Sequence, residues 1–302
     1  MAVLAEGHPG LGMLQGESVT DVYPHLLRYV LEHGERVSPR GRPTLEVSPF
    51  VFQLHDPLQS LVLQRERRLN RAYATVEKLA LVAGIEDPAM LCFYIDRLNE
   101  FVNPTTGAFD GCYGPRVAAQ LSYVYTLLRS DPDSRRAVIA IYSQRDEHES
   151  LDVPCTLTLQ FLLRRGKLSL IVNMRSSDVY LGLPYDVNQF CFLQQVMASW
   201  LGVGLGQYTH VAGSAHVYFS DSDAIHRVLE APSQCFDAPS DPDFAIPFNE
   251  TQDALTEFFE LERTFRQSGS RSHNVQRLHK CLQPPAECLS KFCRRKLASE
   301  LG

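Results

Sequence analysis

The sequence contains one tryptophan, Trp200, and only five lysines against 24 arginines in its 302 residues. No apolar run approaches the ~18–20 residues of a membrane helix, and no basic segment leads into an apolar core near the N-terminus, so we expect neither a membrane protein nor a secretory signal. Eight cysteines without paired spacing do not predict a disulfide framework, which favours a reducing cytoplasm. The net charge of −6 argues against a general nucleic-acid binder.

The remaining composition is that of an ordinary globular protein, with 44% hydrophobic and 21% charged residues. We expect a single domain over residues 1–302, with a helical lead-in at 1–40 and a helical, basic extension at 248–302. Residues 231–247 are rich in proline, aspartate and serine, which is typical of a loop. From Arg263 onward there are nine lysines and arginines and two acids, which we interpret as a solvated helix pair.

Hydrophobic periodicity divides the chain into helices and strands. The helical period predicts helices at 23–32, 69–83, 118–128, 190–201 and 252–266. Alternating and β-branched residues predict strands at 136–142, 155–174 and 216–219. The second of these is a hairpin, because Arg164-Arg165-Gly166-Lys167 interrupts it with a turn signal.

One cysteine stands beside residues that suit covalent chemistry. Cys155 follows a proline in an apolar strand, a place where a cysteine is ordinarily a small core residue. Three arginines flank it in sequence, namely Arg135, Arg136 and Arg175. Guanidinium groups bind phosphate bidentately and lower the pKa of a neighbouring thiol, which favours the reactive thiolate. The pattern predicts a nucleophilic cysteine acting on a phosphorylated substrate.

The same region carries an ordered set of motifs. They are Ser134-Arg135-Arg136, Pro154-Cys155, Gln160-Phe161, Arg175-Ser176-Ser177-Asp178, Leu181-Gly182-Leu183-Pro184 and His216-Val217-Tyr218. In this order and spacing, over about residues 111–218, they resemble the thymidylate synthase family. The resemblance implies an α+β (two-layer α/β) fold with a mixed sheet packed back-to-back in a homodimer and helices on the other face.

The resemblance also implies a role for each matching residue on the nucleotide side. Cys155 would add to C6 of a pyrimidine nucleotide, which makes C5 nucleophilic. The ligands of the 5′-phosphate would be Arg175 and Ser176 of one subunit, Arg135 and Arg136 of its partner across the dimer interface, and an arginine of the SPRGRP loop, where we favour Arg40 over Arg42. His216 and Tyr218 would bind the sugar 3′-hydroxyl, and Gln160 is expected among the substrate-binding residues.

On the other side of the site, the resemblance implies 5,10-methylenetetrahydrofolate as the one-carbon donor. Asp178 resembles the folate-binding aspartate, and Glu77 resembles a glutamate that contacts the folate and organises waters and proton transfer. Tyr113 resembles the tyrosine beside the base at the site of proton abstraction. No metal is expected, because Cys281, Cys288, Cys293 and His279 lack metal-ligand spacing.

The most informative departure from the family's synthases is Asp186. The synthases have an asparagine there, whose amide reads O4 and N3 of uracil. A carboxyl group can accept from the 4-amino group of cytosine and, when protonated, donate to N3, whereas an ionised carboxylate would repel the uracil O4. A mismatched base would leave buried polar groups unpaired, so discrimination can be large. Aspartate is also what the hydroxymethylase branch of the family has, and we expect cytosine as the base.

Other departures are compatible with capture of water. Thr156 replaces a histidine that commonly follows the cysteine, and the positions that would align with the synthases' tryptophans are Ile95, Leu98 and Val117. The chain ends in LASELG instead of the tail that closes the synthase site. A synthase excludes water so that hydride reaches the intermediate. A hydroxymethylase must admit water and activate it, here through Glu77 as general base.

The hypothesis is a cytidylate 5-hydroxymethylase that converts CMP, methylenetetrahydrofolate and water into 5-hydroxymethyl-CMP and tetrahydrofolate. The arginine-rich, lysine-poor composition suits an actinomycete, where such ribonucleotide enzymes serve nucleoside-antibiotic pathways. Ser176 is the residue of the deoxynucleotide enzymes, so dCMP is expected as a further substrate. Three alternatives stay open: a dCMP-preferring hydroxymethylase, a thymidylate synthase methylating dUMP, and a non-catalytic nucleotide- or RNA-binding protein that uses the basic tail.

Overall fold

The computed structural model describes residues 3–4, 12–146, 150–231, 243–269 and 274–300. Its α-helices are α1 (Val19–His33), α2 (Arg71–Ala83), α3 (Pro88–Tyr94), α4 (Tyr113–Ser130), α5 (Leu183–Leu201), α6 (Ser222–Glu230), α7 (Phe248–Ser268) and α8 (Gln283–Glu300). Its strands are β1 (Val3–Leu4), β2 (Gly12–Gly16), β3 (Glu35–Val37), β4 (Thr44–Val47), β5 (Phe50–Leu54), β6 (Val138–Ala140), β7 (Thr156–Arg164), β8 (Lys167–Met174), β9 (Ser177–Asp178), β10 (Gly204–Ala212) and β11 (Ala215–Tyr218). Most of the loop expected at 231–247 lies outside the described residues.

The larger sheet is mixed, as the sequence predicted. Its strand order is β1-β2-β5-β10-β8-β7-β6, with β2 parallel to β5, β10 parallel to β8, and the other neighbours antiparallel. The predicted hairpin is β7 and β8. Its turn places Arg165 and Gly166 at φ of 53° and 71°, the left-handed values that a tight hairpin turn requires at both central positions.

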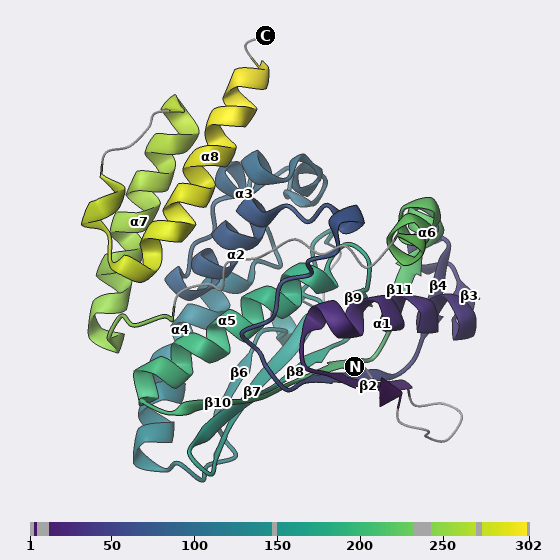
Figure 1. The fold of residues 1–302 in the computed structure, drawn as a ribbon, viewed down its shortest axis with the longest axis horizontal. Helices are drawn as coiled ribbons and strands as arrows, with labels where there is room; N and C mark the ends of the chain where they lie inside the picture. The colour runs from purple at the N-terminus through teal and green to yellow at the C-terminus, as the bar shows by residue number, and fades with distance from the viewer. Residues whose placement is uncertain (1–2, 5–11, 147–149, 232–242, 270–273, 301–302) are drawn as a thin grey trace.

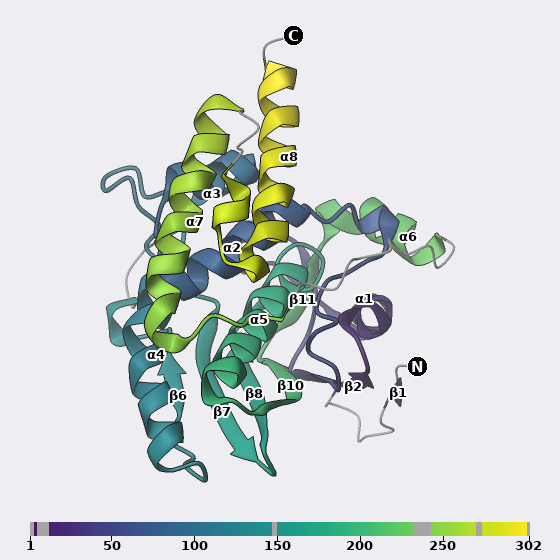
Figure 2. The same cartoon turned by 60° about the vertical axis from the view of Figure 1, so that its left-hand side comes forward.

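Helices α2, α4 and α5 lie over one face of this sheet (Figures 1 and 2). Helix α5 packs between the sheet and the other helices, and residues 187–198 form an unbroken buried run. That position explains why most of its residues are apolar, although the buried run also contains Asn188, Gln189, Gln194 and Gln195. No helix among the described residues covers the opposite face of the sheet.

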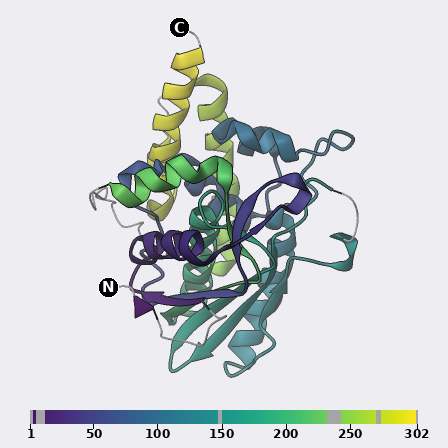
Figure 3. The same cartoon turned by 90° about the vertical axis from the view of Figure 1, so that its right-hand side faces the viewer.

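A smaller sheet in the order β3-β4-β11-β9 packs against helix α1 (Figures 1 and 3). Strands β9 and β11 run parallel, which sets His216 opposite Asp178. Strand β4 pairs with the other side of β11 and sets Glu46 opposite His216. The sheet therefore joins a motif near residue 178 to another near residue 216.

The N-terminal lead-in is not only helical, which corrects the expectation. Strand β2 lies parallel to β5 inside the larger sheet. Helix α1 begins before the predicted residue 23, because Ser18 and Asp21 form a reciprocal capping box at its start.

The C-terminal region is a pair of helices, as expected, but the expectation of a solvated pair was wrong. Helices α7 and α8 pack against each other and against α2 (Figure 2). Apolar side chains of both helices are buried, among them Phe258, Phe265 and Leu289. The basic residues of the sequence lie between these apolar positions, so the charge count concealed an amphipathic pair. No helix in the described part of the chain is long and apolar enough to cross a membrane.

One buried carboxylate ties the helix pair to the rest of the fold. Glu262 of α7 is 1% exposed and accepts hydrogen bonds from the Tyr94 hydroxyl (2.9 Å) and from Nε of Arg266 (3.0 Å). Arg266 also lies 3.6 Å from Asp87, at the start of α3. The contacts join segments that are far apart in the sequence.

Candidate active site

Cys155 lies directly before β7, in a segment held from several directions. The Arg175 amide donates to the Cys155 carbonyl (2.9 Å), and the Arg175 guanidinium donates to the carbonyls of Val153 and Pro154 (both 2.9 Å). The hydroxyl oxygen of Tyr113, the first residue of α4, accepts from the amides of Cys155 (3.2 Å) and Thr156 (3.1 Å). These bonds fix the backbone on both sides of the sulfur.

The electrostatics of the thiol differ in part from expectation. Arg175 Nη2 lies 3.8 Å from Cys155 Sγ, and this arginine lowers the pKa of the thiol as expected. Burial has the larger effect, however, and together with the negative charge of Asp186 it raises the pKa above its ordinary value. Within one chain Cys155 is therefore a half-buried thiol whose cationic neighbours only partly offset the cost of ionisation.

Arg40 is the N-terminal arginine that the fold brings toward the sulfur. It occupies a left-handed conformation, with φ of 52° and ψ of 33°, in the turn Pro39–Gly41, and its side chain is exposed. Its charge lowers the pKa of the Cys155 thiol. Its role as a phosphate ligand, in preference to Arg42, stays a prediction.

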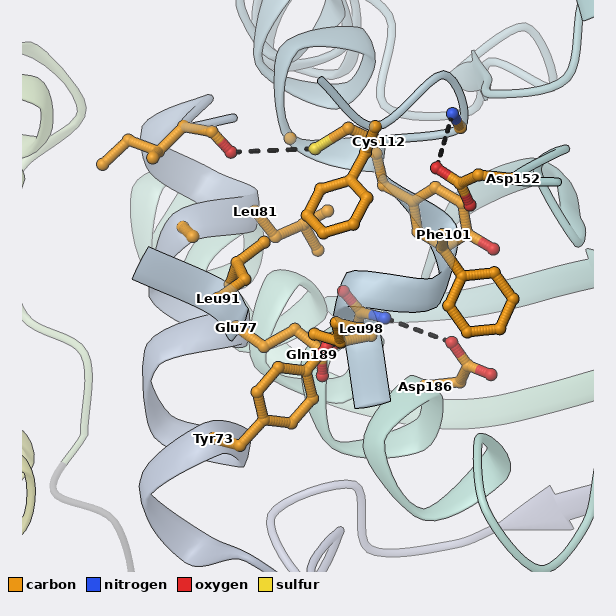
Figure 4. Close-up of a pocket in the computed structure, with 16 residues that line it drawn as sticks. Tyr73, Glu77, Leu81, Leu91, Leu98, Phe101, Cys112, Asp152, Asp186 and Gln189 are labelled. Carbon is orange, nitrogen blue, oxygen red and sulfur yellow. Dashed lines mark hydrogen bonds between the residues drawn. The ribbon is translucent and has the colours of Figure 1, made fainter. Parts of the chain in front are cut away.

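A cavity of about 270 Å³ lies beside the cysteine segment (Figure 4). Its lining residues are Tyr73, Glu77, Ala80, Leu81, Ile85, Leu91, Leu98, Phe101, Phe109, Gly111, Cys112, Tyr113, Gly114, Asp152, Asp186 and Gln189. One wall is apolar and aromatic, and three carboxylates face the same space. A pocket of this kind orients a flat, largely apolar ligand by a few polar groups.

Glu77 lies on α2 and reaches the pocket together with Tyr73, one helical turn earlier. The Tyr73 hydroxyl donates to Glu77 Oε1 (2.7 Å), while Oε2 is enclosed and has no hydrogen-bond partner. Burial raises the pKa of Glu77 to about 8, a rise that the Tyr73 hydrogen bond opposes and the charge of Asp186 increases. Glu77 is therefore mostly protonated at neutral pH.

Asp186 lies in the first turn of α5, which begins earlier than predicted because Pro184 fits the start of a helix. Gln189 Nε2 donates to Asp186 Oδ1 (3.1 Å). Burial raises the pKa of Asp186 to about 7, against the Gln189 hydrogen bond and with a contribution from Asp178. Both protonation states of this carboxyl group are populated at neutral pH.

The smaller sheet places the remaining motif residues near this edge. Asp178 Oδ1 accepts from the amides of Tyr180 (3.0 Å) and Leu181 (2.9 Å), and burial raises the pKa of Asp178 to about 6. The rings of His216 and Tyr218 meet edge to face at 5.3 Å. Burial lowers the pKa of His216, which keeps the imidazole neutral near pH 7.

Three predicted substrate ligands do not meet Cys155 within one chain. Arg135 and Arg136 are exposed in the segment before β6, and Gln160 Nε2 donates to the Arg135 carbonyl (3.0 Å). Gln160 lies five residues beyond Cys155, roughly 16 Å along a strand. Ser176, next to Arg175, is half-buried between β8 and β9.

The structure reveals partners that the motifs did not predict. Tyr73 and Gln189 hold the two central carboxylates, and their i,i+4 and i,i+3 spacings to Glu77 and Asp186 are a signal that the sequence contains. Arg67 is 7% exposed, donates to the Leu181 carbonyl (3.3 Å), and stacks 4.7 Å from the Tyr180 ring centroid. Nothing local in the sequence distinguishes Arg67 from the neighbouring arginines.

The residues present fit a folate. Of the positions aligned with the synthases' tryptophans, Leu98 lines the pocket, whereas Val117 is buried and Ile95 only half-buried, both outside its lining. Leu98 and its apolar neighbours form a wall suited to a flat ring system. Within the described segments, no group of three or more His, Cys, Asp or Glu side chains could hold a metal ion.

Comparison with known proteins identifies the family of the chain. The model of the thymidylate synthase family matches residues 21–262. The chain is 30% identical over 278 residues to a deoxyuridylate hydroxymethyltransferase of Bacillus phage SP01, covering 81% of this chain and 72% of the phage protein. It is also 30% identical over 118 residues to the bifunctional dihydrofolate reductase-thymidylate synthase of Paramecium tetraurelia, covering 39% of this chain and 26% of that protein. The chain belongs to the thymidylate synthase family of folate-dependent one-carbon transferases.

Proposed function

We propose that this enzyme is a cytidylate 5-hydroxymethylase. It transfers a one-carbon unit from methylenetetrahydrofolate to C5 of CMP and captures water, giving 5-hydroxymethyl-CMP and tetrahydrofolate. dCMP is a further substrate, because Ser176 is the residue of the family's deoxynucleotide enzymes. A place in nucleoside-antibiotic biosynthesis belongs to the same proposal, on the arginine-rich composition.

The observation that carries the proposal is the carboxyl group of Asp186 in the pocket. With a pKa of about 7, it is available as the neutral acid, whose O–H donates to N3 of cytosine while the other oxygen accepts from the 4-amino group. Gln189 holds Oδ1 and fixes the orientation of the group. Uracil, which presents N3–H and a carbonyl, would require the proton on Oδ1, where it would weaken the hydrogen bond that this oxygen accepts from Gln189.

The other site residues take the roles that the family motif assigns. Cys155 attacks C6, and Arg175, Ser176 and Arg40 bind the 5′-phosphate from the same subunit. His216 and Tyr218 bind the sugar. The neutral imidazole of His216 suits a hydrogen bond to a hydroxyl group.

The residues around the folate support its part in the proposal. Methylenetetrahydrofolate supplies the one-carbon unit, with Asp178 as its polar ligand and the apolar wall near Leu98 as its ring site. Glu77 organises water and proton transfer around the pyrimidine ring, and Tyr113 lies next to the C5 proton that is removed. The small side chain at Leu98, in place of an indole, leaves room for water to reach the C5 substituent.

We further propose that the chain is one catalytic domain acting as a cytoplasmic homodimer. One face of the larger sheet has no helix of the described residues over it, and its half-buried residues include Leu162 and Ile171. Packing that face against a second copy would leave Arg135 and Arg136 free to reach the partner's phosphate site. Gln160 would accompany them, since it hydrogen-bonds the Arg135 backbone.

A second candidate is hydroxymethylation of a deoxyuridylate. The phage relative of 30% identity is named for that reaction, which shares water capture and differs in the base. Methylation of dUMP, as in the synthases, is a third outcome.

The test is mass analysis of products formed from methylenetetrahydrofolate and an equimolar mixture of CMP, dCMP and dUMP. We expect one CH₂O unit gained on CMP, with less on dCMP. A CH₂O unit on dUMP would favour the second candidate, and a CH₂ unit on dUMP with dihydrofolate would refute hydroxymethylation. The Asp186→Asn variant should shift preference from cytosine to uracil nucleotides. The exposed Asp253→Asn is the matched control, and an unchanged preference in Asp186→Asn would contradict our reading of Asp186.

A further inference from the structure

The pocket contains a carboxylate for which the proposed mechanism has no role. Asp152 lies three residues before Cys155, in the segment that leads into β7, and lines the same cavity as Glu77 and Asp186 (Figure 4). Its side chain is half-buried. An acid at this point of the chain is a candidate for chemistry at the reacting carbon.

The position of the Asp152 carboxylate is fixed. The amide of Gly111 donates to Oδ2 (2.8 Å), and the Asp152 amide donates to Ser150 Oγ (3.0 Å). Among the hydrogen bonds of the described residues, Oδ1 accepts none. A Cβ on residue 111 would lie 2.6 Å from the Asp152 carbonyl oxygen and 3.0 Å from Oδ1, so only glycine permits this approach. One oxygen is anchored, and the other is available to a donor in the pocket.

Asp152 is also close enough to the nucleophile to interact with it electrically. Its negative charge raises the pKa of the Cys155 thiol, and it has the same effect on Cys112, another pocket residue. Cys155 would bond to C6, and C5 is the adjacent ring atom. A carboxylate that lines this pocket and lies three residues before the sulfur in the chain is therefore a candidate to face the substituent on C5.

Glu77 is less suited to take a proton from water. Its Oε1 accepts from Tyr73, and its carboxyl group is already mostly protonated at neutral pH. A protonated acid cannot act as a general base. Burial raises the pKa of Asp152 as well, and the charges of Asp110 and Glu86 add to the rise, against the Gly111 amide and Arg116. The unbonded oxygen of Glu77 is enclosed, however, whereas Asp152 lines the pocket with Oδ1 available.

We propose that Asp152 is the general base for water capture, an inference that rests on the proposed function. After one-carbon transfer, C5 bears a methylene group conjugated with C4. The water oxygen bonds to the methylene carbon, its proton passes to Asp152, and the π electron pair moves to the C4 nitrogen. The pair then returns to form C5=C6 as the C6–S bond breaks and Cys155 leaves as thiolate. Asp152 gives its proton to solvent, and Glu77 keeps the proton transfers on the base.

The test compares Asp152→Asn with the wild type. Asparagine can still accept from the Gly111 amide through its carbonyl oxygen, but it cannot take a proton. The first step to measure is the release of tritium from CMP labelled at C5 during a single turnover. We expect the variant to release tritium at least as fast as the wild type, because the negative charge of Asp152, which opposes the Cys155 thiolate, is gone. Steady-state formation of 5-hydroxymethyl-CMP should fall about 100-fold. A thiol such as 2-mercaptoethanol reacts as its thiolate and needs no general base in the pocket. It should therefore add to the methylene group on C5, restore turnover and give a C5 thioether.

The matched control is Glu86→Gln. Glu86 is exposed and outside the pocket lining, yet its charge raises the pKa of Asp152. The variant therefore removes a negative charge near the pocket and leaves the Asp152 carboxylate in place. We expect its product rate to equal that of the wild type. An unchanged product rate in Asp152→Asn would overturn the inference. An equal loss of tritium release and of product would also overturn it, because that result would mean that Asp152 only maintains the conformation of the segment before Cys155. If the wild type forms no CH₂O adduct on any nucleotide, the proposed function itself fails.

Discussion

Replacing Glu77 by glutamine should stabilise the free protein at alkaline pH. The pKa of Glu77 is raised from its ordinary value of 4.5 to about 8. A carboxyl group with a raised pKa in the folded state contributes stability below its unfolded pKa and loses that contribution as pH rises toward the folded pKa. At ~1.4 kcal/mol per pKa unit the loss is at most ~5 kcal/mol, and partial solvent screening reduces our expectation to about 2–4 kcal/mol.

The assay is urea denaturation of the wild type and of Glu77→Gln between about pH 5 and pH 9. The stability difference between the two should grow with pH in favour of the variant by the stated amount, although the variant loses activity. Glu257→Gln, an exposed change on α7, should show no such growth. A constant difference for Glu77→Gln across the range would refute the argument that burial raises this pKa.

Three further outcomes follow from the contacts described. Cytosine recognition by neutral Asp186 predicts that kcat/KM for CMP falls about tenfold per pH unit above its pKa of about 7, and that Asp186→Asn lacks this decline. Tyr94→Phe removes a donor to buried Glu262 and should lower the free energy of unfolding by about 1–3 kcal/mol in urea denaturation. Arg175→Lys should raise both the pKa of Cys155, measured by its alkylation rate against pH, and the KM for nucleotide, because Arg175 lowers that pKa and holds the cysteine segment.

The sequence predicted the centre of the fold well, because local physics decides it. Alternation of apolar residues and an Arg-Gly turn suffice to specify the hairpin of β7 and β8. A largely apolar run of three helical turns suffices to predict most of α5, whose residues 187–198 are all buried. Motif order then brought Cys155, Arg175 and Asp186 into one prediction, and the fold gathers them at one edge.

Contacts between distant segments could not be predicted in this way. Nothing near Glu262 in the sequence indicates Tyr94, 168 residues away, so the helix pair at the C-terminus was mistaken for a solvated one. The pKa of the Cys155 thiol depends on burial, which the spacing of motifs does not indicate. Burial raises this pKa by more than the neighbouring arginines lower it. Nothing near Asp152 in the sequence indicates Gly111, 41 residues earlier, whose amide orients its carboxylate.

The two amides that point at the Tyr113 hydroxyl have a consequence for its charge. An oxygen that receives two backbone N–H groups occupies the geometry that hydrolases use as an oxyanion hole. Burial raises the pKa of Tyr113 well above its ordinary value, and the Thr156 amide opposes that rise. A phenolate that takes the C5 proton and becomes the phenol would find its stabilising dipoles already in place. They belong to the nucleophile's own backbone and to the next residue, so displacing the Cys155 segment would weaken the attack on C6 and the proton removal from C5 together.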